Sequence, residues 1–242
     1  MHRTICSALF ALAALLAHGG ATARVDPQEW LREAEAAYDR VANYTAIFHK
    51  QQRVAGELLP AETIFLKCRK RPFSLYMKWI KAPYLGSELL FAKGWNGDQA
   101  RVHRGGILRF ITHNLDPGHP GLMADNLRPV TSVGIGFLLE TVATDMRKAL
   151  KAGELTFSER DAATLYGRKT RVLEVVFPRE KAKDYEGRRY VIDQDAESKI
   201  LVRIRVYDAD DQLMESYGYE NLDLNAPLGD ADFAPENPEY HF

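Results

Sequence analysis

Residues 73–79, FSLYMKW, decide the fold, because apolar and polar side chains alternate along them. The large apolar side chains stand at every second position: Phe73, Leu75, Met77 and Trp79. Successive side chains of a β-strand point to opposite faces of a sheet, so this period of two predicts a strand with one buried face. The stretch therefore predicts a sheet with an apolar side, and the flanking sequence extends that prediction.

The same alternation recurs before and after this stretch. It predicts strands near residues 44–48, 64–68, 73–79, 87–93, 98–104, 106–112, 154–160, 169–177, 187–194, 199–207 and 212–223. Asn96-Gly97 and Gly105-Gly106 are turn dipeptides, and strands joined by such short turns must run antiparallel. About eleven antiparallel strands in one chain suggest a single, strongly curved sheet.

Two segments follow the helical period of 3.6 instead. The first spans about residues 27–42 and starts at Asp26-Pro27, where aspartate can cap the helix and proline suits its first position. The second starts near Ile135 and ends before Gly153. The expected fold class is mainly β (α+β), with these two amphipathic helices covering the concave face of the sheet. A gap left beneath the helices would be an apolar cavity.

The N-terminus has the features of a secretory signal peptide. Arg3 supplies positive charge, an apolar run follows it, and Ala21-Thr22-Ala23 is a small-x-small cleavage site. We expect cleavage after Ala23, which removes residues 1–23 and leaves residues 24–242 as a single domain in the periplasm. The apolar run is too short to persist as an anchor, and no transmembrane segment is expected after processing.

Composition and motifs exclude several function classes. The formal net charge is −1 and basic and acidic residues are mixed throughout, so a nucleic-acid partner is not expected. The sequence has no nucleophile elbow, phosphate-binding loop or metal-binding pair at helical spacing. No catalytic residue, metal or cofactor is therefore expected, and the protein is not predicted to be an enzyme. Cys68 lies in an alternating strand and is expected to be a buried structural thiol.

Several motifs together resemble a known family. They are Phe48-His49-Lys50-Gln51, Arg71-Pro72-Phe73, Tyr76-Met77-Lys78-Trp79, Pro83, Gly86 and Gly94-Trp95-Asn96-Gly97. This set is similar to the N-terminal half of the periplasmic outer-membrane lipoprotein carriers, the superfamily of lipoprotein localisation factors A and B. The tail, from Tyr217 to Phe242, resembles an exported bacterial subfamily of unassigned function. The segment from Asp116 to Gly121 has no counterpart in this resemblance.

The resemblance implies an open half-barrel whose hydrophobic cavity holds a lipid or the acyl chain of a lipoprotein beneath a helical lid. The expected lining residues are Phe48, Ile64, Leu66, Leu75, Met77, Trp79, Leu89 and Phe91 from the strands, with Leu138 and Val142 from the second helix. Arg71 matches the family's arginine at the lid and would lie at the cavity rim. The competing interpretations are ordinary core packing for the apolar residues and a solvated charge for Arg71.

Three functions remain open at this point. The first is a monomeric periplasmic carrier in envelope lipid or lipoprotein trafficking, which takes its cargo from an inner-membrane donor complex. The second is an interaction or stress-sensing protein that binds an exported protein partner. The third is a hydrolase of envelope components, which would need clustered titratable groups in its cleft. A cavity smaller than about 300 Å³ would favour the packed-core interpretation.

Overall fold

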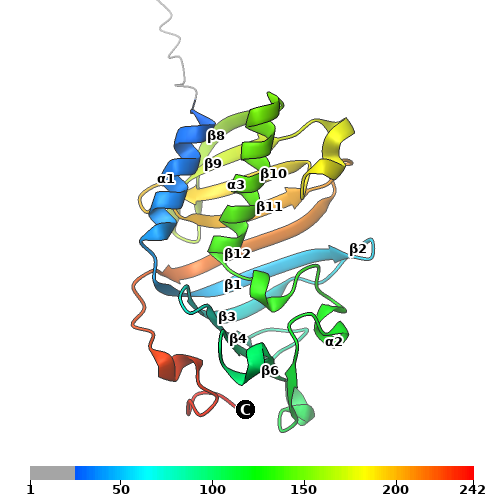
Figure 1. Cartoon of the computed structure of the whole chain (residues 1–242), viewed down its shortest axis with the longest axis vertical. Helices are drawn as coiled ribbons and strands as arrows, with labels where there is room; N and C mark the ends of the chain where they lie inside the picture. Colours follow the sequence, from blue (N-terminus) through cyan, green and yellow to red (C-terminus); the bar gives the residue numbers. More distant parts are fainter. Residues whose placement is uncertain (1–24) are drawn as a thin grey trace, which may run out of the picture.

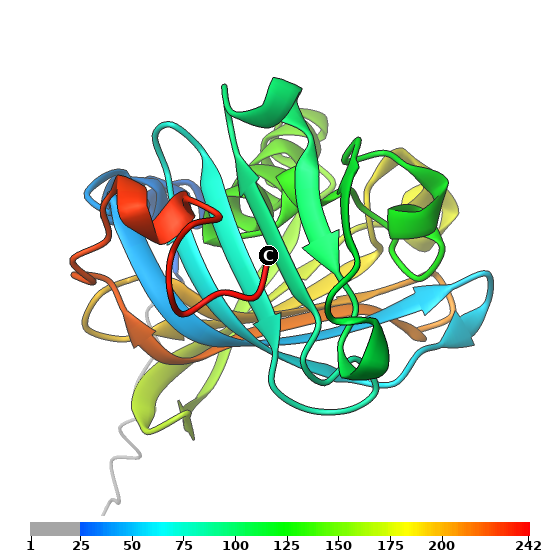
Figure 2. The same cartoon turned by 90° about the horizontal axis from the view of Figure 1, so that it is seen from below.

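The computed structural model describes residues 25–242, and the expected signal peptide, residues 1–23, lies outside them. Within the described part of the chain, no helix is long and apolar enough to cross a membrane. The dominant element is one antiparallel sheet of twelve strands, which curves strongly and stays open (Figures 1 and 2). The predicted fold class, a single open antiparallel sheet with covering helices, is confirmed.

Most of the chain consists of strands that follow one another, with few helices between them. They are β1 (Asn43–Val54), β2 (Glu57–Leu58), β3 (Glu62–Arg69), β4 (Ser74–Trp79), β5 (Glu88–Ala92), β6 (Ala100–His103), β7 (Thr112–Leu115), β8 (Thr156–Leu165), β9 (Arg168–Val176), β10 (Arg189–Asp195), β11 (Leu201–Tyr207) and β12 (Leu213–Asp223). Their order across the sheet is β7-β6-β5-β4-β3-β1-β12-β11-β10-β9-β8, with β2 paired to β1. The first long strand and the last one are therefore neighbours at the centre of the sheet.

The helices cover only one half of the concave face. Helices α1 (Pro27–Asp39) and α3 (Ile135–Ala152) lie side by side over β8–β12 (Figure 1). They approach closely at Gly136, where an added Cβ would lie 2.5 Å from the Tyr38 ring. Trp30 of α1 is buried and donates a hydrogen bond of 3.0 Å to Gln194 of β10. This half of the concave face is thus filled by helix side chains, as an ordinary core would be.

The other half of the concave face, formed by β1 and β3–β7, lies under an irregular chain. We call residues 116–134 the covering segment; it contains the short helix α2 (Pro120–Met123) and crosses this half in Figure 1. It ends at Gly134, whose positive φ of 118° turns the chain into α3, and there the Ile135 N–H donates to the Tyr44 hydroxyl at 3.0 Å. This cover was not predicted from the sequence.

One predicted strand is wrong. The sequence predicted a strand over residues 106–112, but the chain forms a 3-10 turn at Gly106–Leu108, and β7 starts only at Thr112. Gly106 has a φ of 71°, a left-handed conformation that interrupts an extended strand. The turn signal at Gly105-Gly106 was therefore correct, but the connection is longer than a tight hairpin.

The C-terminal tail crosses the convex face of the sheet (Figure 2). Tyr240 stacks on Tyr76 of β4 with ring centroids 3.7 Å apart. Lys67 of β3 donates to Asp232 at 2.9 Å and to Glu239 at 3.1 Å. The convex side of β3–β5 is therefore covered by the tail, while the concave side faces the covering segment.

A partly covered cavity as the candidate binding site

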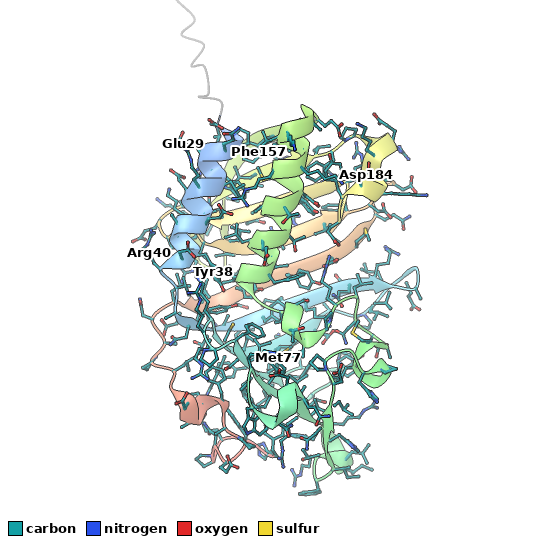
Figure 3. All side chains as sticks on the ribbon, in the orientation of Figure 1. Glu29, Tyr38, Arg40, Met77, Phe157 and Asp184 are labelled. Atoms are coloured by element: carbon teal, nitrogen blue, oxygen red, sulfur yellow. The ribbon has the colours of Figure 1, made fainter. Side chains whose placement is uncertain are left out.

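A cavity of about 700 Å³ lies between the concave face of β1 and β3–β6 and the covering segment. Its volume falls within the range of about 300–1,000 Å³ that is usual for ligand sites. It exists because α1 and α3 fill only the other half of the curved sheet. Met77, near the middle of the half that α1 and α3 leave free in Figure 3, is one of the residues that line it.

Strand register divides the concave face at the cavity into rows that run across the strands. We define the apolar rows as Leu66–Met77–Leu89–Val102 and Tyr219–Phe48–Ile64–Trp79, each made of directly paired residues. Phe48 stacks on Tyr219 with centroids 5.1 Å apart. Leu138 and Val133 close this end from above. One end of the cavity is therefore walled by hydrocarbon and aromatic surface.

The next rows along the same strands are polar. We define the polar rows as Tyr217–Lys50–Glu62 and Glu215–Gln52, which continue the concave face two and four residues beyond Phe48. Lys50 donates to Glu62 at 2.6 Å, and the Trp79 indole N–H donates to the same carboxylate at 2.6 Å. Buried charges are tolerated when they are paired in this way. The cavity thus changes from apolar to charged along the strand direction.

The covering segment is attached to the sheet through the polar rows. Three consecutive residues make the contacts, and we call them the latch: Asn126, Leu127 and Arg128. The Asn126 side-chain oxygen accepts from Lys50, and the Leu127 N–H donates to the Gln52 side-chain oxygen at 3.3 Å. Arg128 binds Glu215 through two hydrogen bonds of 3.0 and 3.2 Å.

Electrostatics strengthen the last of these contacts. Burial of Arg128 works against its charged form, yet the hydrogen bonds that it donates to Glu215 and Glu186 raise its pKa above the ordinary value. Burial, together with the Glu215 carboxylate, raises the pKa of the Tyr217 hydroxyl as well. Arg128 therefore stays cationic and Tyr217 stays neutral at any physiological pH, so the latch does not depend on titration of these two groups.

The structure places the predicted lining residues in two groups. Phe48, Met77, Trp79, Leu89 and Leu138 line the cavity. The others are buried in the core around it: Ile64, Leu66, Leu75, Phe91 and Val142. Leu75 pairs with Cys68 and with Phe91, one row further from the polar end, where packed side chains fill the space.

Arg71 lies in the exposed turn between β3 and β4 and is not among the residues that line the cavity. That turn is at the end of the strands opposite the polar rows. Its neighbour Lys70 contacts the end of α1, donating to the Tyr38 carbonyl at 3.3 Å and to Asp39 at 3.1 Å. Hydrogen bonds to the covering segment are instead made by Lys50, Gln52 and Glu215 of the polar rows and by Tyr84 of the loop between β4 and β5.

Sequence reasoning missed the polar rows and the latch. Lys50 and Gln52 share the face of Phe48 because they follow it at a period of two, and this was a readable signal. The latch had no comparable signal, because residues 126–128 follow an irregular segment without periodicity. Over residues 25–242, no group of three or more His, Cys, Asp or Glu side chains is arranged to hold a metal ion.

Comparison with known proteins gives a family and a set of similar folds. The profile of DUF1571, described as a protein of unknown function, matches residues 41–242. No curated protein sequence matches the chain. The fold is similar to that of the Mycobacterium tuberculosis lipoprotein LppX, with a TM-score of 0.51, 14% identity, and coverage of 84% of this chain and 99% of LppX. This likeness confirms the lipoprotein-carrier-like fold expected from the sequence.

Two further solved structures are similar at lower scores. A putative outer membrane lipoprotein-sorting protein domain from Vibrio parahaemolyticus has a TM-score of 0.38 and 11% identity, with 86% of this chain and 97% of that chain covered. MucB in the Pseudomonas aeruginosa MucA/MucB complex has a TM-score of 0.47 and 15% identity, with 87% of this chain and 61% of that chain covered. The chain thus spans less than two thirds of the MucB chain.

Proposed function

Because the DUF1571 profile covers most of the chain, the protein belongs to that family, and from the cavity we propose that it binds an amphiphile: a lipid, or the acyl chain of a lipoprotein. The observation that carries the proposal is the change from apolar to polar rows along the cavity wall. An acyl chain fits the apolar rows, and the polar part of the same molecule fits the rows around Lys50 and Glu62.

The energetics favour this assignment. Burying an acyl chain contributes about 0.8 kcal/mol per methylene, so roughly sixteen carbons give on the order of 10 kcal/mol before the cost of ordering the chain. A polar headgroup beside Lys50, Glu62 and Gln52 can form hydrogen bonds with these side chains, whereas hydrocarbon cannot. A buried polar group that is left without a hydrogen-bond partner costs about 1–3 kcal/mol. The cavity therefore suits an amphiphile better than either a pure hydrocarbon or a sugar.

We further propose that residues 24–242 act as one domain in the periplasm after removal of residues 1–23, and that the role is binding and transfer rather than catalysis. The cargo would come from a lipid or lipoprotein donor in the inner membrane. Fractionation of cells that express the full chain, with N-terminal sequencing of the mature protein, tests the export part of this proposal. An N-terminus at Arg24 in the periplasmic fraction is the expected result.

The binding proposal is tested by native purification followed by lipid extraction and mass spectrometry, and by titration with a fluorescent fatty acid. A co-purifying lipid and saturable uptake are expected. Repeated empty extractions without uptake would overturn the proposal, and capture of one stoichiometric exported protein without lipid would favour the interaction alternative.

A matched pair of variants locates the ligand. Val102→Trp adds an indole to the cavity wall and is expected to reduce fatty-acid uptake at least tenfold, because it occupies space on the apolar rows. Val176→Trp makes the same change at a half-buried position of β9 outside the cavity and should leave uptake unchanged. Equal loss in both variants would mean that the ligand does not occupy this cavity.

A further inference from the structure

The connection between β6 and β7 carries large apolar side chains into solvent. Ile107 is 92% exposed and Phe110 is 78% exposed, with Leu108 at 45% and Ile111 at 51%. We call residues 104–111 the tip; it forms the highest point of the concave side in Figure 2. Scattered exposed apolar residues are normal, but a concentrated patch marks an interaction site.

The tip forms one surface with the loop between β4 and β5. At Gly105 an added Cβ would lie 2.0 Å from the Leu85 carbonyl oxygen, so the two loops touch through their backbones. Leu85 is itself 61% exposed and Tyr84 is 37% exposed. Within residues 25–242, all exposed large apolar side chains fall between residues 80 and 127: Ile80, Tyr84, Leu85, Ile107, Leu108, Phe110, Ile111 and Leu127.

The charged side chains of the tip are all basic. Residues 99–115 contain Arg101, Arg104 and Arg109 and no aspartate or glutamate. Arg104 and Arg109 are exposed, and the Arg109 guanidinium lies over the Phe110 ring at 4.7 Å from its centroid. Arginine beside exposed aromatic and aliphatic side chains is a composition that binds an anionic lipid interface. The apolar side chains enter the boundary between headgroups and acyl chains, and the guanidinium groups bind the lipid phosphates.

The patch is continuous with the cavity mouth. Tyr84, Leu85, Arg104 and Gly105 belong to the two loops and also line the cavity. We propose that the tip docks the protein on the surface of an anionic phospholipid membrane, with the cavity mouth turned toward the bilayer. A projecting apolar tip suits a fluid interface, whereas a protein partner of ordinary size needs a broader buried area of about 800 Å² on each side.

The docking is measured with the mature chain and two kinds of vesicle. One contains phosphatidylethanolamine and phosphatidylglycerol, and the other contains phosphatidylcholine alone; binding is followed by co-sedimentation at low and at physiological salt. Binding to the anionic vesicles is expected, at least tenfold tighter than to the neutral ones and weaker at higher salt. Absence of binding to the anionic vesicles would overturn the proposal.

Two double variants separate the apolar and the charged contributions. Ile107→Ser/Phe110→Ser and Arg104→Glu/Arg109→Glu are each expected to reduce binding to anionic vesicles at least tenfold. Arg32→Glu/Arg40→Glu makes the same charge change at an exposed position of α1 and at the exposed residue that caps its C-terminus, and it should stay within twofold of the parent. Equal loss in the α1 variant would show that net charge, not the tip, drives binding. Undiminished binding in both tip variants would also contradict the proposal.

A second copy of the chain is the alternative occupant of this surface. If the parent self-associates in sedimentation velocity, does not bind vesicles, and the serine variant is monomeric, the tip is a dimer interface and the membrane proposal fails. Fatty-acid uptake by the Ile107→Ser/Phe110→Ser variant is expected to be normal, because neither residue lines the cavity. Loss of vesicle binding and loss of cargo binding are thus separate outcomes, and either proposal can fail alone.

Discussion

Lys50 is a charged residue in a buried environment. Only 7% of its surface is exposed, and its ammonium depends on the Glu62 carboxylate and the Asn126 amide. A buried ion pair contributes little net stability, but removal of one partner leaves the other charge uncompensated. The pair should therefore behave as a unit when it is mutated.

Lys50→Met is expected to lower the free energy of unfolding by about 3 kcal/mol, because it leaves the Glu62 carboxylate buried without its cation. The double variant Lys50→Met/Glu62→Gln removes both charges, keeps a hydrogen-bond acceptor for Trp79, and should recover at least half of that loss. Urea unfolding followed by circular dichroism measures both. Additive losses in the double variant would show that the two residues are energetically independent.

Cys68 illustrates what burial does to a thiol. Burial raises its pKa from 9.0 to about 12, and only the thiolate reacts with disulfide reagents. In the folded protein at pH 8 the thiol should resist an aromatic disulfide reagent for hours, and it should react within minutes in urea. Rapid labelling of the native protein would show that the core around β3 opens readily.

The same pKa shift gives a pH dependence of stability. Because the folded state holds the proton of Cys68 more tightly than the unfolded state, the contribution of this thiol to stability is constant below about pH 9 and is lost as pH rises toward 12. The buried hydroxyls of Tyr44 and Tyr219, whose pKa values burial also raises, add to the loss in the same direction. Thermal midpoints measured from pH 7 to pH 11 should therefore decline only in the alkaline part of the range.

At the scale of elements, the latch ties the covering segment to the polar rows. Asn126, Leu127 and Arg128 each contact a polar-row side chain, and apart from short helical turns the rest of the covering segment is irregular. The Leu127–Gln52 hydrogen bond joins neutral groups and contributes about 1 kcal/mol, and those that involve a charged group contribute about 1.5–3 kcal/mol each. The segment should therefore open locally at a much lower free energy than the sheet.

Gln52→Ala/Asn126→Ala removes two latch contacts and is expected to raise hydrogen exchange in residues 116–130 by about tenfold, with little change in β1 and β12. Mass spectrometry of peptic fragments gives the readout. Asn114→Ala in β7, an exposed side chain that accepts a hydrogen bond from Asn96, is the control and should exchange like the parent. Unchanged exchange in the double variant would mean that other contacts hold the cover.

Sequence periodicity predicted the elements that obey it. The strand FSLYMKW, its neighbours and both long helices were predicted close to their observed positions, because a sheet or helix with one buried face must repeat at its own period. The covering segment has no such repeat, so neither its path nor the latch could be predicted. The half-covered cavity, which depends on how two helices share a large concave face, was likewise beyond the reach of periodicity.

At the scale of the whole molecule, the curved sheet has two unequal halves. The half under α1 and α3 has a packed core, and the half made of β1 and β3–β7 contains the cavity. A ligand that fills the cavity binds only the folded state and so stabilises the entire sheet by mass action.

Saturation with fatty acid at about one hundred times its dissociation constant is expected to add about 2.7 kcal/mol and to raise the thermal midpoint by roughly 5–10 °C. The Val102→Trp variant should show a smaller rise than Val176→Trp under the same conditions. A rise of equal size in both would place the stabilising ligand elsewhere on the protein.

The pairing of β1 with β12 also affects the order in which the sheet can form during synthesis. Phe48 lies opposite Tyr219, so the first long strand meets its central neighbour only when nearly the entire chain is available. A ribosome or a translocation pore delivers the N-terminal end first. Until the final strand emerges, β1 has an open edge that could pair with another chain. Protection of this one edge during synthesis is therefore a condition for making the protein in soluble form.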